Sequence, residues 1–326
     1  MERLSRIVFF GTSSFALPAL EALCQKGLQP VLVITTPDAP VGRKQILAPS
    51  PVKIKARALG LSVYDPKTLK SEEVISRISQ IEPEVGVLAA YGKILPKALI
   101  DLFPNGILNI HPSLLPRWRG PTPVQSAILA GDEKTGVTIF LIDEELDHGA
   151  ILAQKELEIE NLKLETYQTL HDKLAKLGAE LLLETLPLWL EGKITPLPQN
   201  HNQATFSKKF TRKDAKIDWQ KSAVEIDRLV RALNPEPGVW AIWNKPRGTT
   251  TSTQTILKIL EGEAISNLRN LESKNPGEIF EYEGKLAIKC GDGALILRTI
   301  QPEGKKPMSG EDFLHGHKEI IGKILC

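Results

Sequence analysis

Short apolar runs alternate with segments of helical spacing over the first 111 residues, and this alternation constrains the fold more than any other feature of the chain. The apolar runs lie at residues 6–10, 29–37, 61–66, 83–92 and 106–111, and the helical segments at 11–27, 52–60, 71–81 and 96–104. Strands that alternate with helices pair in parallel, through right-handed crossovers that place helices on both faces of the sheet. The pattern therefore predicts an α/β fold with a doubly wound, Rossmann-like parallel sheet.

The rest of the chain predicts a second, smaller domain. A helix at 121–132 precedes two strand-like runs, at 135–143 and 149–160, which we expect to form an antiparallel pair. A long helical segment follows at 166–192. The sequence then becomes polar and rich in Pro, and several short β-like runs with turn signals follow, which is typical of a small barrel. Because 326 residues exceed what one compact core holds, we expect three parts. These are a Rossmann-like domain at 1–190, a linker at 191–208 and a smaller OB-like β-barrel domain at 209–326.

Composition excludes several classes of protein. No apolar run approaches 18 residues, and the first residues lack the apolar core of a signal peptide, so we expect no membrane span and no export. The three cysteines, Cys24, Cys290 and Cys326, are scattered and odd in number, which favours a reducing compartment without disulfides. Their spacing matches no metal site. We therefore expect a cytoplasmic protein that holds no metal.

Charge is distributed unevenly along the chain. Residues 205–326 carry 20 Lys and Arg against 16 Asp and Glu, a net charge of +4, whereas residues 1–204 carry a net charge of −2. Basic clusters such as "KKFTRKDAK" would suit contacts with phosphates, although solvated surface charges are the ordinary explanation of such clusters. Charge alone leaves both interpretations open.

Two polar residues interrupt the apolar run "GILNIH" just before a Pro-containing loop. Because side chains alternate along a strand, Asn109 and His111 share one face while Leu108 and Ile110 take the other. Ligands of such sheets gather at the carboxyl ends of the strands, which is where His111 lies. An amide donor and a histidine aimed at one point would hold an oxyanion and move a proton. Asp147, in the turn "LDHG", is the carboxylate that would orient the imidazole.

The candidate site formed by Asn109, His111 and Asp147 contains no nucleophile. No serine lies in a G-x-S-x-G motif, and Cys24 falls inside the first helical segment, so an acceptor molecule would supply the attacking atom. Each residue alone also has a plain structural explanation. A strand histidine is usually satisfied by its neighbours, Asn109 would bond to a loop carbonyl, and Asp147 would serve in an Asx turn.

Together these residues resemble a specific family. The sequence is similar to the 10-formyltetrahydrofolate-dependent formyltransferases at three motifs. These are Asn109-x-His111, "SLLP" at 113–116 with Gly120, and Leu146-Asp147-x-Gly149. Further similarity follows in order along nearly the whole chain: "GTSSFALPALEAL", "TTPDAPVGR", "APSPVK", "AYGKILP", "LLPRWRGPTPVQSAILAGDEKTGVTI", "IDW", "RALNPEPG" and "GKKPMSG". The motifs of the tail resemble the members of the family that formylate methionyl-tRNA.

The resemblance implies a reaction that agrees with the residues. The α-amine of methionine on initiator methionyl-tRNA would attack the formyl carbon of 10-formyltetrahydrofolate, which is consumed as co-substrate, and the product would serve translation initiation. Asn109 and His111 would stabilise the tetrahedral oxyanion, and Asp147 would hold His111 in its useful tautomer and help to remove the amine proton. No metal is needed. The folate pocket would be walled by Ser113, Leu114, Leu115 and Pro116.

The resemblance also implies where tRNA binds. The loop at 36–50 is longer than the 2–6 residues usual between a strand and a helix, and in the family an insertion here meets the acceptor end of tRNA. Arg43 matches the arginine of that insertion, and Lys44 adds a charge. A mobile surface loop is the alternative. The basic C-terminal barrel would contact phosphates, and the enzyme is expected to act as a monomer.

Two other functions fit parts of the sequence. A sugar-nucleotide amine formyltransferase, or a formyltetrahydrofolate hydrolase, would share Asn109, His111 and Asp147, and only the loop at 36–50 and the basic tail favour tRNA over these alternatives. A nucleotide-binding module without chemistry fits poorly. The segment "FFGTSSFALP" follows a strand and opens a helix, but it has one glycine where G-x-G-x-x-G has three.

Overall fold

The computed structural model describes residues 6–42, 45–159, 164–244, 254–266 and 273–326. The chain forms two compact units. Unit 1 comprises Met1–Val124, Glu133–Glu160 and Gln168–Lys208, and unit 2 comprises Gln125–Asp132, Asn161–Tyr167 and Lys209–Cys326. The residues predicted as a linker, 191–208, thus belong to unit 1. The predicted domain boundaries themselves stay a prediction.

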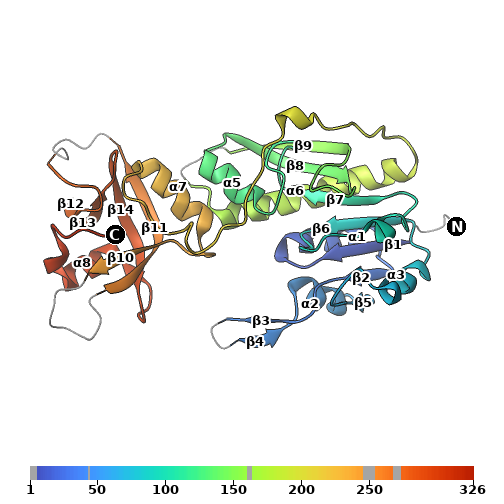
Figure 1. Cartoon of the computed structure of the whole chain (residues 1–326), viewed down its shortest axis with the longest axis horizontal. Helices are drawn as coiled ribbons and strands as arrows, with labels where there is room; N and C mark the ends of the chain where they lie inside the picture. The colour runs from blue at the N-terminus through green and yellow to red at the C-terminus, as the bar shows by residue number, and fades with distance from the viewer. Residues whose placement is uncertain (1–5, 43–44, 160–163, 245–253, 267–272) are drawn as a thin grey trace. The chain divides into compact units, whose positions relative to one another are not determined.

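Unit 1 is built on a seven-stranded sheet with the order β5-β2-β1-β6-β7-β8-β9 (Figure 1). Its strands are β1 (Ile7–Gly11), β2 (Leu32–Ile34), β5 (Val63–Tyr64), β6 (Val85–Ala89), β7 (Ile107–His111), β8 (Lys134–Leu141) and β9 (Ile151–Glu158). The first five are parallel, and β8 and β9 run antiparallel at one edge. The predicted doubly wound sheet is confirmed. The order reverses direction between β1 and β6, and ligands bind at such a switch point.

Helices cover both faces of this sheet. They are α1 (Leu17–Gln25), α2 (Pro51–Ala58), α3 (Glu72–Ser79), α4 (Lys97–Ile100) and α6 (Tyr167–Leu190), with short 3₁₀ turns at Ser14–Ala16 and His201–Gln203. On one face, Ile107 of β7 packs in a cluster with Ile78 of α3 and Leu99 of α4. On the other face Ile110 lies against Gly178 of α6, where a Cβ would come within 2.6 Å of the Ile110 side chain. Asn109 and His111 therefore continue the Ile107 face, as the strand period requires.

The loop predicted at 36–50 contains a short hairpin. Strands β3 (Ala39–Val41) and β4 (Ile46–Ala48) pair in antiparallel, and Figure 1 shows them extending away from the rest of unit 1. Their side chains are largely exposed, so no buried alternating pattern announced them. At the base of the hairpin the buried Lys53 ammonium lies 2.5 Å from the Asp38 carboxylate and 2.7 Å from that of Asp65. Hydrogen bonds to Asp38 and then Asp65 raise the pKa of Lys53, so this side chain stays charged.

Unit 2 is an antiparallel sheet with the order β10-β11-β14-β13-β12, and β15 pairs with β14. Its strands and helices are β10 (Trp240–Asn244), β11 (Gln254–Ile265), β12 (Ile279–Tyr282), β13 (Lys285–Lys289), β14 (Ala294–Pro302), β15 (Met308–Ser309), α7 (Ala223–Leu233), α8 (Gly310–Gly316) and a 3₁₀ turn at Lys318–Ile320. The helix α5 (Pro123–Ala130) falls largely in this unit. These strands confirm the predicted OB-like domain.

The last residues of the chain join the two edges of that sheet. Leu325 bridges to Trp243 of β10, and Ile324 bridges to Glu278, which directly precedes β12. The N–H groups of Ile242 and Cys326 each donate to the carbonyl of the other, at 2.6 and 3.0 Å. The C-terminal segment thus acts as the strand that closes the sheet into a barrel. Among the described residues, no helix has the length and apolar character needed to span a membrane.

This closure makes Leu325 important for the stability of unit 2. Leu325 is 2% exposed, so Leu325→Ala is expected to lower the free energy of unfolding by about 2–4 kcal/mol through the cavity that it leaves. Ile324→Ala, at a side chain that is 46% exposed, is the control and is expected to cost less than about 1 kcal/mol. Urea unfolding followed by the tryptophan fluorescence of Trp219, Trp240 and Trp243 measures both. Equal costs would contradict the role of Leu325 in closure.

Candidate active site

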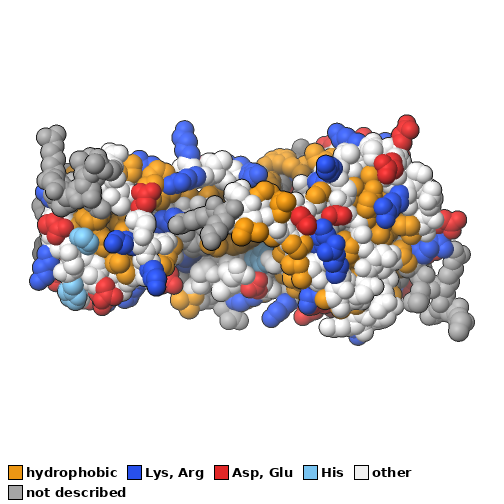
Figure 2. Space-filling view, turned by 90° about the horizontal axis from the view of Figure 1, so that it is seen from below, with side chains coloured by type: hydrophobic (Ala, Val, Ile, Leu, Met, Phe, Trp, Pro, Cys, Tyr) orange, Lys and Arg blue, Asp and Glu red, His pale blue; other side chains and the backbone are white. Residues whose placement is uncertain are grey.

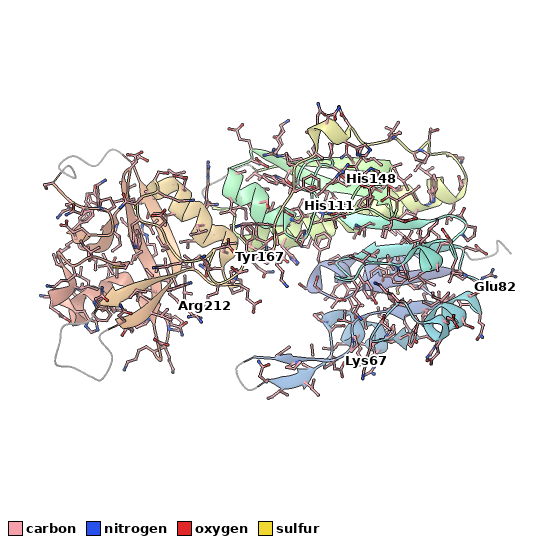
Figure 3. All side chains as sticks on the ribbon, in the orientation of Figure 1. Lys67, Glu82, His111, His148, Tyr167 and Arg212 are labelled. Carbon is pink, nitrogen blue, oxygen red and sulfur yellow. The ribbon has the colours of Figure 1, made fainter. Side chains whose placement is uncertain are left out.

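His111 ends β7 and is 5% exposed, and both of its ring nitrogens face oxygen atoms. Nε2 lies 3.0 Å from the backbone carbonyl oxygen of Trp118, and Nδ1 lies 3.8 Å from Oδ2 of Asp147. A carbonyl only accepts hydrogen bonds, so Nε2 carries a proton in this arrangement. The Nδ1 edge is left facing the Asp147 carboxylate. Figure 3 labels His111 in unit 1.

Asp147 reaches His111 by a less direct route than the sequence suggested. Its loop begins beside the amino end of β7, where the N–H of Ile142 donates to the carbonyl of Ile107 at 2.9 Å. Because β8 is antiparallel to β7, the loop has to return along β7 by about 13 Å, the rise of four strand residues from Ile107, to reach His111. Asp147 itself has φ 49°, a left-handed conformation uncommon for residues other than glycine. Its carboxylate Oδ2 accepts a 2.6 Å hydrogen bond from the N–H of Gly120.

Strands β8 and β9 hold the loop that follows His111 through hydrogen bonds to its backbone. The Thr138 hydroxyl of β8 donates to the Ser113 carbonyl at 2.7 Å and accepts from the Leu115 N–H at 3.0 Å. The Gln154 amide of β9 donates to the Leu115 carbonyl at 2.8 Å. The Ser113 and Leu115 side chains are buried, whereas those of Leu114 and Pro116 are partly exposed. The four residues predicted to wall a folate pocket therefore form a fixed surface beside His111.

Asn109 lies two residues before His111 on the same face, opposite Leu88 of β6 and Phe140 of β8. Its side chain is 9% exposed. Within the described part of the chain no group bonds to the Asn109 amide, which leaves its N–H donors for a bound molecule. Arg43 and Lys44 lie outside the described residues, between the two strands of the β3–β4 hairpin.

The segment predicted as a linker contributes contacts that the sequence analysis missed. Thr205 accepts a 2.9 Å hydrogen bond from the Trp118 N–H through its hydroxyl, and its carbonyl accepts from the Arg119 N–H at 2.9 Å. The Ser207 N–H donates to the Arg119 carbonyl at 2.7 Å. Residues 205–207 thus pair with the loop that carries Gly120. A polar stretch without periodicity carries no signal for such pairing.

Comparison with known proteins assigns this chain to a family. The formyl transferase model matches residues 5–186, and the model of the formyl transferase C-terminal domain matches residues 209–318. The chain belongs to the formyl transferase family. It is an enzyme that transfers formyl groups, as the resemblance implied.

Relatives match over almost the whole chain. The methionyl-tRNA formyltransferase of Chloroflexus aurantiacus is 43% identical over 313 residues, which are 95% of this chain and 96% of that protein. The methionyl-tRNA formyltransferase of Methylococcus capsulatus is 42% identical over 320 residues, 98% and 99% of the two chains. Among solved structures, the N-formyltransferase of Helicobacter canadensis in complex with folinic acid and dTDP-3-aminofucose has a TM-score of 0.62. It is 20% identical to this formyl transferase and covers 90% of this chain and 98% of its own, which shows a shared fold.

Gly120 is a position where the site tolerates little change. It has φ 104°, and a Cβ added there would lie 2.8 Å from the Ser207 carbonyl oxygen. Gly120→Ala is therefore expected to displace the N–H that holds Asp147 and to lower kcat by at least about 10-fold. Steady-state kinetics measures the loss, and Gly192→Ala, at a glycine with φ 68° and nothing near its Cβ position, is the matched control. Wild-type kcat in Gly120→Ala would show that this N–H is dispensable.

Proposed function

We propose that this enzyme transfers the formyl group of 10-formyltetrahydrofolate to the α-amine of methionine on initiator methionyl-tRNA, giving N-formylmethionyl-tRNA for translation initiation. The observation that carries the proposal is the similarity to methionyl-tRNA formyltransferases over both units, at 42% identity across 98% of this chain in one case. A similarity confined to unit 1 would support the chemistry alone. The match of residues 209–318 to the family's C-terminal domain supports the acceptor as well.

The site residues suit each step of this reaction. The methionine amine attacks the formyl carbon, forming a C–N bond while the carbonyl electron pair moves to oxygen. The Asn109 amide and the His111 ring, which share one face of β7, would donate to that oxyanion, and the ring would do so through Nε2–H once it exchanges the Trp118 carbonyl for the substrate oxygen. Asp147 would orient His111 from the Nδ1 side and help the amine to lose its proton. Collapse of the intermediate breaks the bond to N10 of the folate, which leaves as tetrahydrofolate after taking up a proton.

The formyl donor would bind against the loop of Ser113, Leu114, Leu115 and Pro116. The bonds from Thr138 and Gln154 hold the backbone of this loop rigidly, and a rigid wall is what a planar pterin requires. Two structural neighbours, the Helicobacter canadensis enzyme and HypX from Aquifex aeolicus, are described in complex with folinic acid and tetrahydrofolic acid respectively. The proposed steps use no metal ion.

The acceptor tRNA would contact both units. Arg43 and Lys44 stand in the sequence between the exposed strands β3 and β4, and residues 205–326 carry the net charge of +4. On the face in Figure 2, Lys and Arg side chains are spread among Asp and Glu, a distribution that suits several phosphate contacts better than one deep site. The enzyme would work in the cytoplasm, as a monomer.

A sugar amine is the alternative acceptor. The Helicobacter canadensis neighbour is described with dTDP-3-aminofucose, and WlaRD, another neighbour with a TM-score of 0.61, is described as a sugar 3N-formyl transferase. Purified enzyme would be incubated with 10-formyltetrahydrofolate and, separately, initiator methionyl-tRNA, elongator methionyl-tRNA and dTDP-3-aminofucose. Formylation of the initiator alone is expected. Transfer to the sugar, or release of formate without transfer to any acceptor, would overturn the proposed acceptor.

Asp147→Asn tests the charge beside His111. The amide oxygen would still accept from the Gly120 N–H, but it carries no negative charge to face His111 Nδ1. We expect kcat to fall by about 10²–10⁴-fold while the protein stays folded by circular dichroism. Glu144→Gln, an exposed carboxylate of the same loop, serves as the control and keeps wild-type kcat. Near-normal turnover in Asp147→Asn would refute the assignment.

Arg43→Ala and Lys44→Ala test the contact with tRNA. Each variant is expected to raise the KM for initiator methionyl-tRNA and to leave the KM for 10-formyltetrahydrofolate unchanged. If these side chains meet phosphates, each loss reduces the slope of log affinity against log salt by about 1. Filter binding of the tRNA between 50 and 200 mM salt, roughly the range over which such contacts weaken, measures the slope. An unchanged slope would place the tRNA elsewhere.

A further inference from the structure

Gln199 lies at the centre of a hydrogen-bond network that includes the backbone of Asp147 and Gly149. Its side chain is 5% exposed, although it stands in a polar stretch of the sequence. The backbone is fixed two residues earlier, where Leu197 and Ile151 exchange two hydrogen bonds of 2.8 Å. Because Ile151 is the first residue of β9, this pairing places Gln199 beside the loop between β8 and β9.

The Gln199 amide uses every hydrogen-bonding position that it has. Its Nε2 donates to the carbonyl of Asp147 at 3.0 Å and to that of Gly149 at 2.8 Å. Its Oε1 accepts from Nε of Arg119 at 3.1 Å and from Nη2 at 2.7 Å. Because a guanidinium only donates and a carbonyl only accepts, the amide has one possible orientation.

Through His201, Arg119 extends the network to His148, the residue between Asp147 and Gly149. Its Nη2 lies 2.8 Å from Nδ1 of His201, which accepts in this contact because a guanidinium only donates. The His201 ring stacks on His148 at 4.1 Å and 7°. His148 in turn lies 2.7 Å from the Asp143 carboxylate through Nδ1, and Figure 3 labels His148 in unit 1 near His111. Residues 147, 148 and 149 are thus held one after another.

Asp147 is consequently held at both ends. Its carboxylate accepts from the N–H of Gly120, the residue next to Arg119, and its carbonyl accepts from Gln199. This matters because Asp147 adopts φ 49° in a loop that has returned along β7, a conformation that the local chain does not favour. Misplacement of a catalytic group by about 1 Å can cost about 100-fold in rate.

We propose that Gln199, clamped by Arg119, is a positioning residue that holds Asp147 in place for formyl transfer. The inference rests on the proposed function, because it assigns Asp147 its role in that reaction. Gln199 acts through the backbone of the loop and need not touch either substrate. Its loss therefore lowers kcat and leaves both KM values unchanged.

Two substitutions separate the bonds that Gln199 donates to the Asp147 loop from the bonds that it accepts from Arg119. Gln199→Met keeps the shape of the side chain and removes all four hydrogen bonds. Gln199→Glu keeps the acceptor for Arg119 but turns a carboxylate toward the carbonyls of Asp147 and Gly149. Both variants are expected to lower kcat by about 10–100-fold, with the KM values for 10-formyltetrahydrofolate and initiator methionyl-tRNA within about twofold of wild type. Gln203→Met, at an exposed glutamine of the same segment, is the matched control.

Coupling to Asp147 distinguishes positioning from general stability. In the Asp147→Asn background, single turnovers with excess enzyme measure the residual rate, and Gln199→Met is expected to lower that rate by less than about threefold. Circular dichroism checks that each variant is folded, and Gln199→Glu decides the question if Gln199→Met does not fold.

The outcomes separate this inference from the proposed function. Wild-type kcat in Gln199→Glu, or raised KM values with unchanged kcat, would overturn the positioning role while leaving the formyl transfer intact. A full multiplicative loss in the Asp147→Asn background would also overturn it. Failure of the wild-type enzyme to formylate methionyl-tRNA would instead refute the proposed function.

Discussion

The hydrogen bond from the Gly120 N–H to the Asp147 carboxylate is the contact on which the site depends. A nearly buried carboxylate is costly unless donors satisfy it, and this N–H meets that need at 2.6 Å. The bond also joins two loops that leave the sheet at different ends, one after β7 and one after β8. His111 stands between them, with one ring nitrogen toward Trp118 of the first loop and the other toward Asp147 of the second. This bond, together with the Arg119–Gln199 network, fixes the carboxylate relative to the histidine.

The antiparallel edge of the sheet explains why so much support surrounds these loops. A parallel strand would have ended beside His111, whereas β8 ends beside the start of β7 and its loop has to return. A loop of this length loses conformational entropy when it is ordered, so other groups have to bond to it to keep it in one conformation. Thr138 and Gln154 support the loop after His111, and residues 197–207 bind both loops from outside. One extended segment thus fixes both loops of the candidate site.

Unit 2 follows a similar principle on a larger scale. Its edge strands are β10 and β12, and the C-terminal residues bond to β10 and to the residue that precedes β12, so backbone groups of β10 and beside β12 are paired. A closed small barrel offers a stable platform for surface charges. That platform is consistent with the acceptor proposed for this formyl transferase.

Sequence alone determined the chemistry and the architecture, because both are written in local patterns. The alternation of strands and helices identified the doubly wound sheet, and the strand period placed Asn109 and His111 on one face at the carboxyl end of β7. The turn "LDHG" marked Asp147, and the family motifs identified a formyl transferase. These inferences needed only neighbouring residues and their spacing.

Tertiary structure alone decided how those residues meet. The hairpin β3–β4 and the barrel closure by Leu325 depend on pairing between backbones, which leaves little trace in a short exposed or terminal segment. The support of Asp147 by Gln199 joins residues that are 52 positions apart in the chain, and a polar stretch without periodicity does not reveal its partners. A buried hydrogen bond is specified by two distant positions in space, and no local pattern contains both.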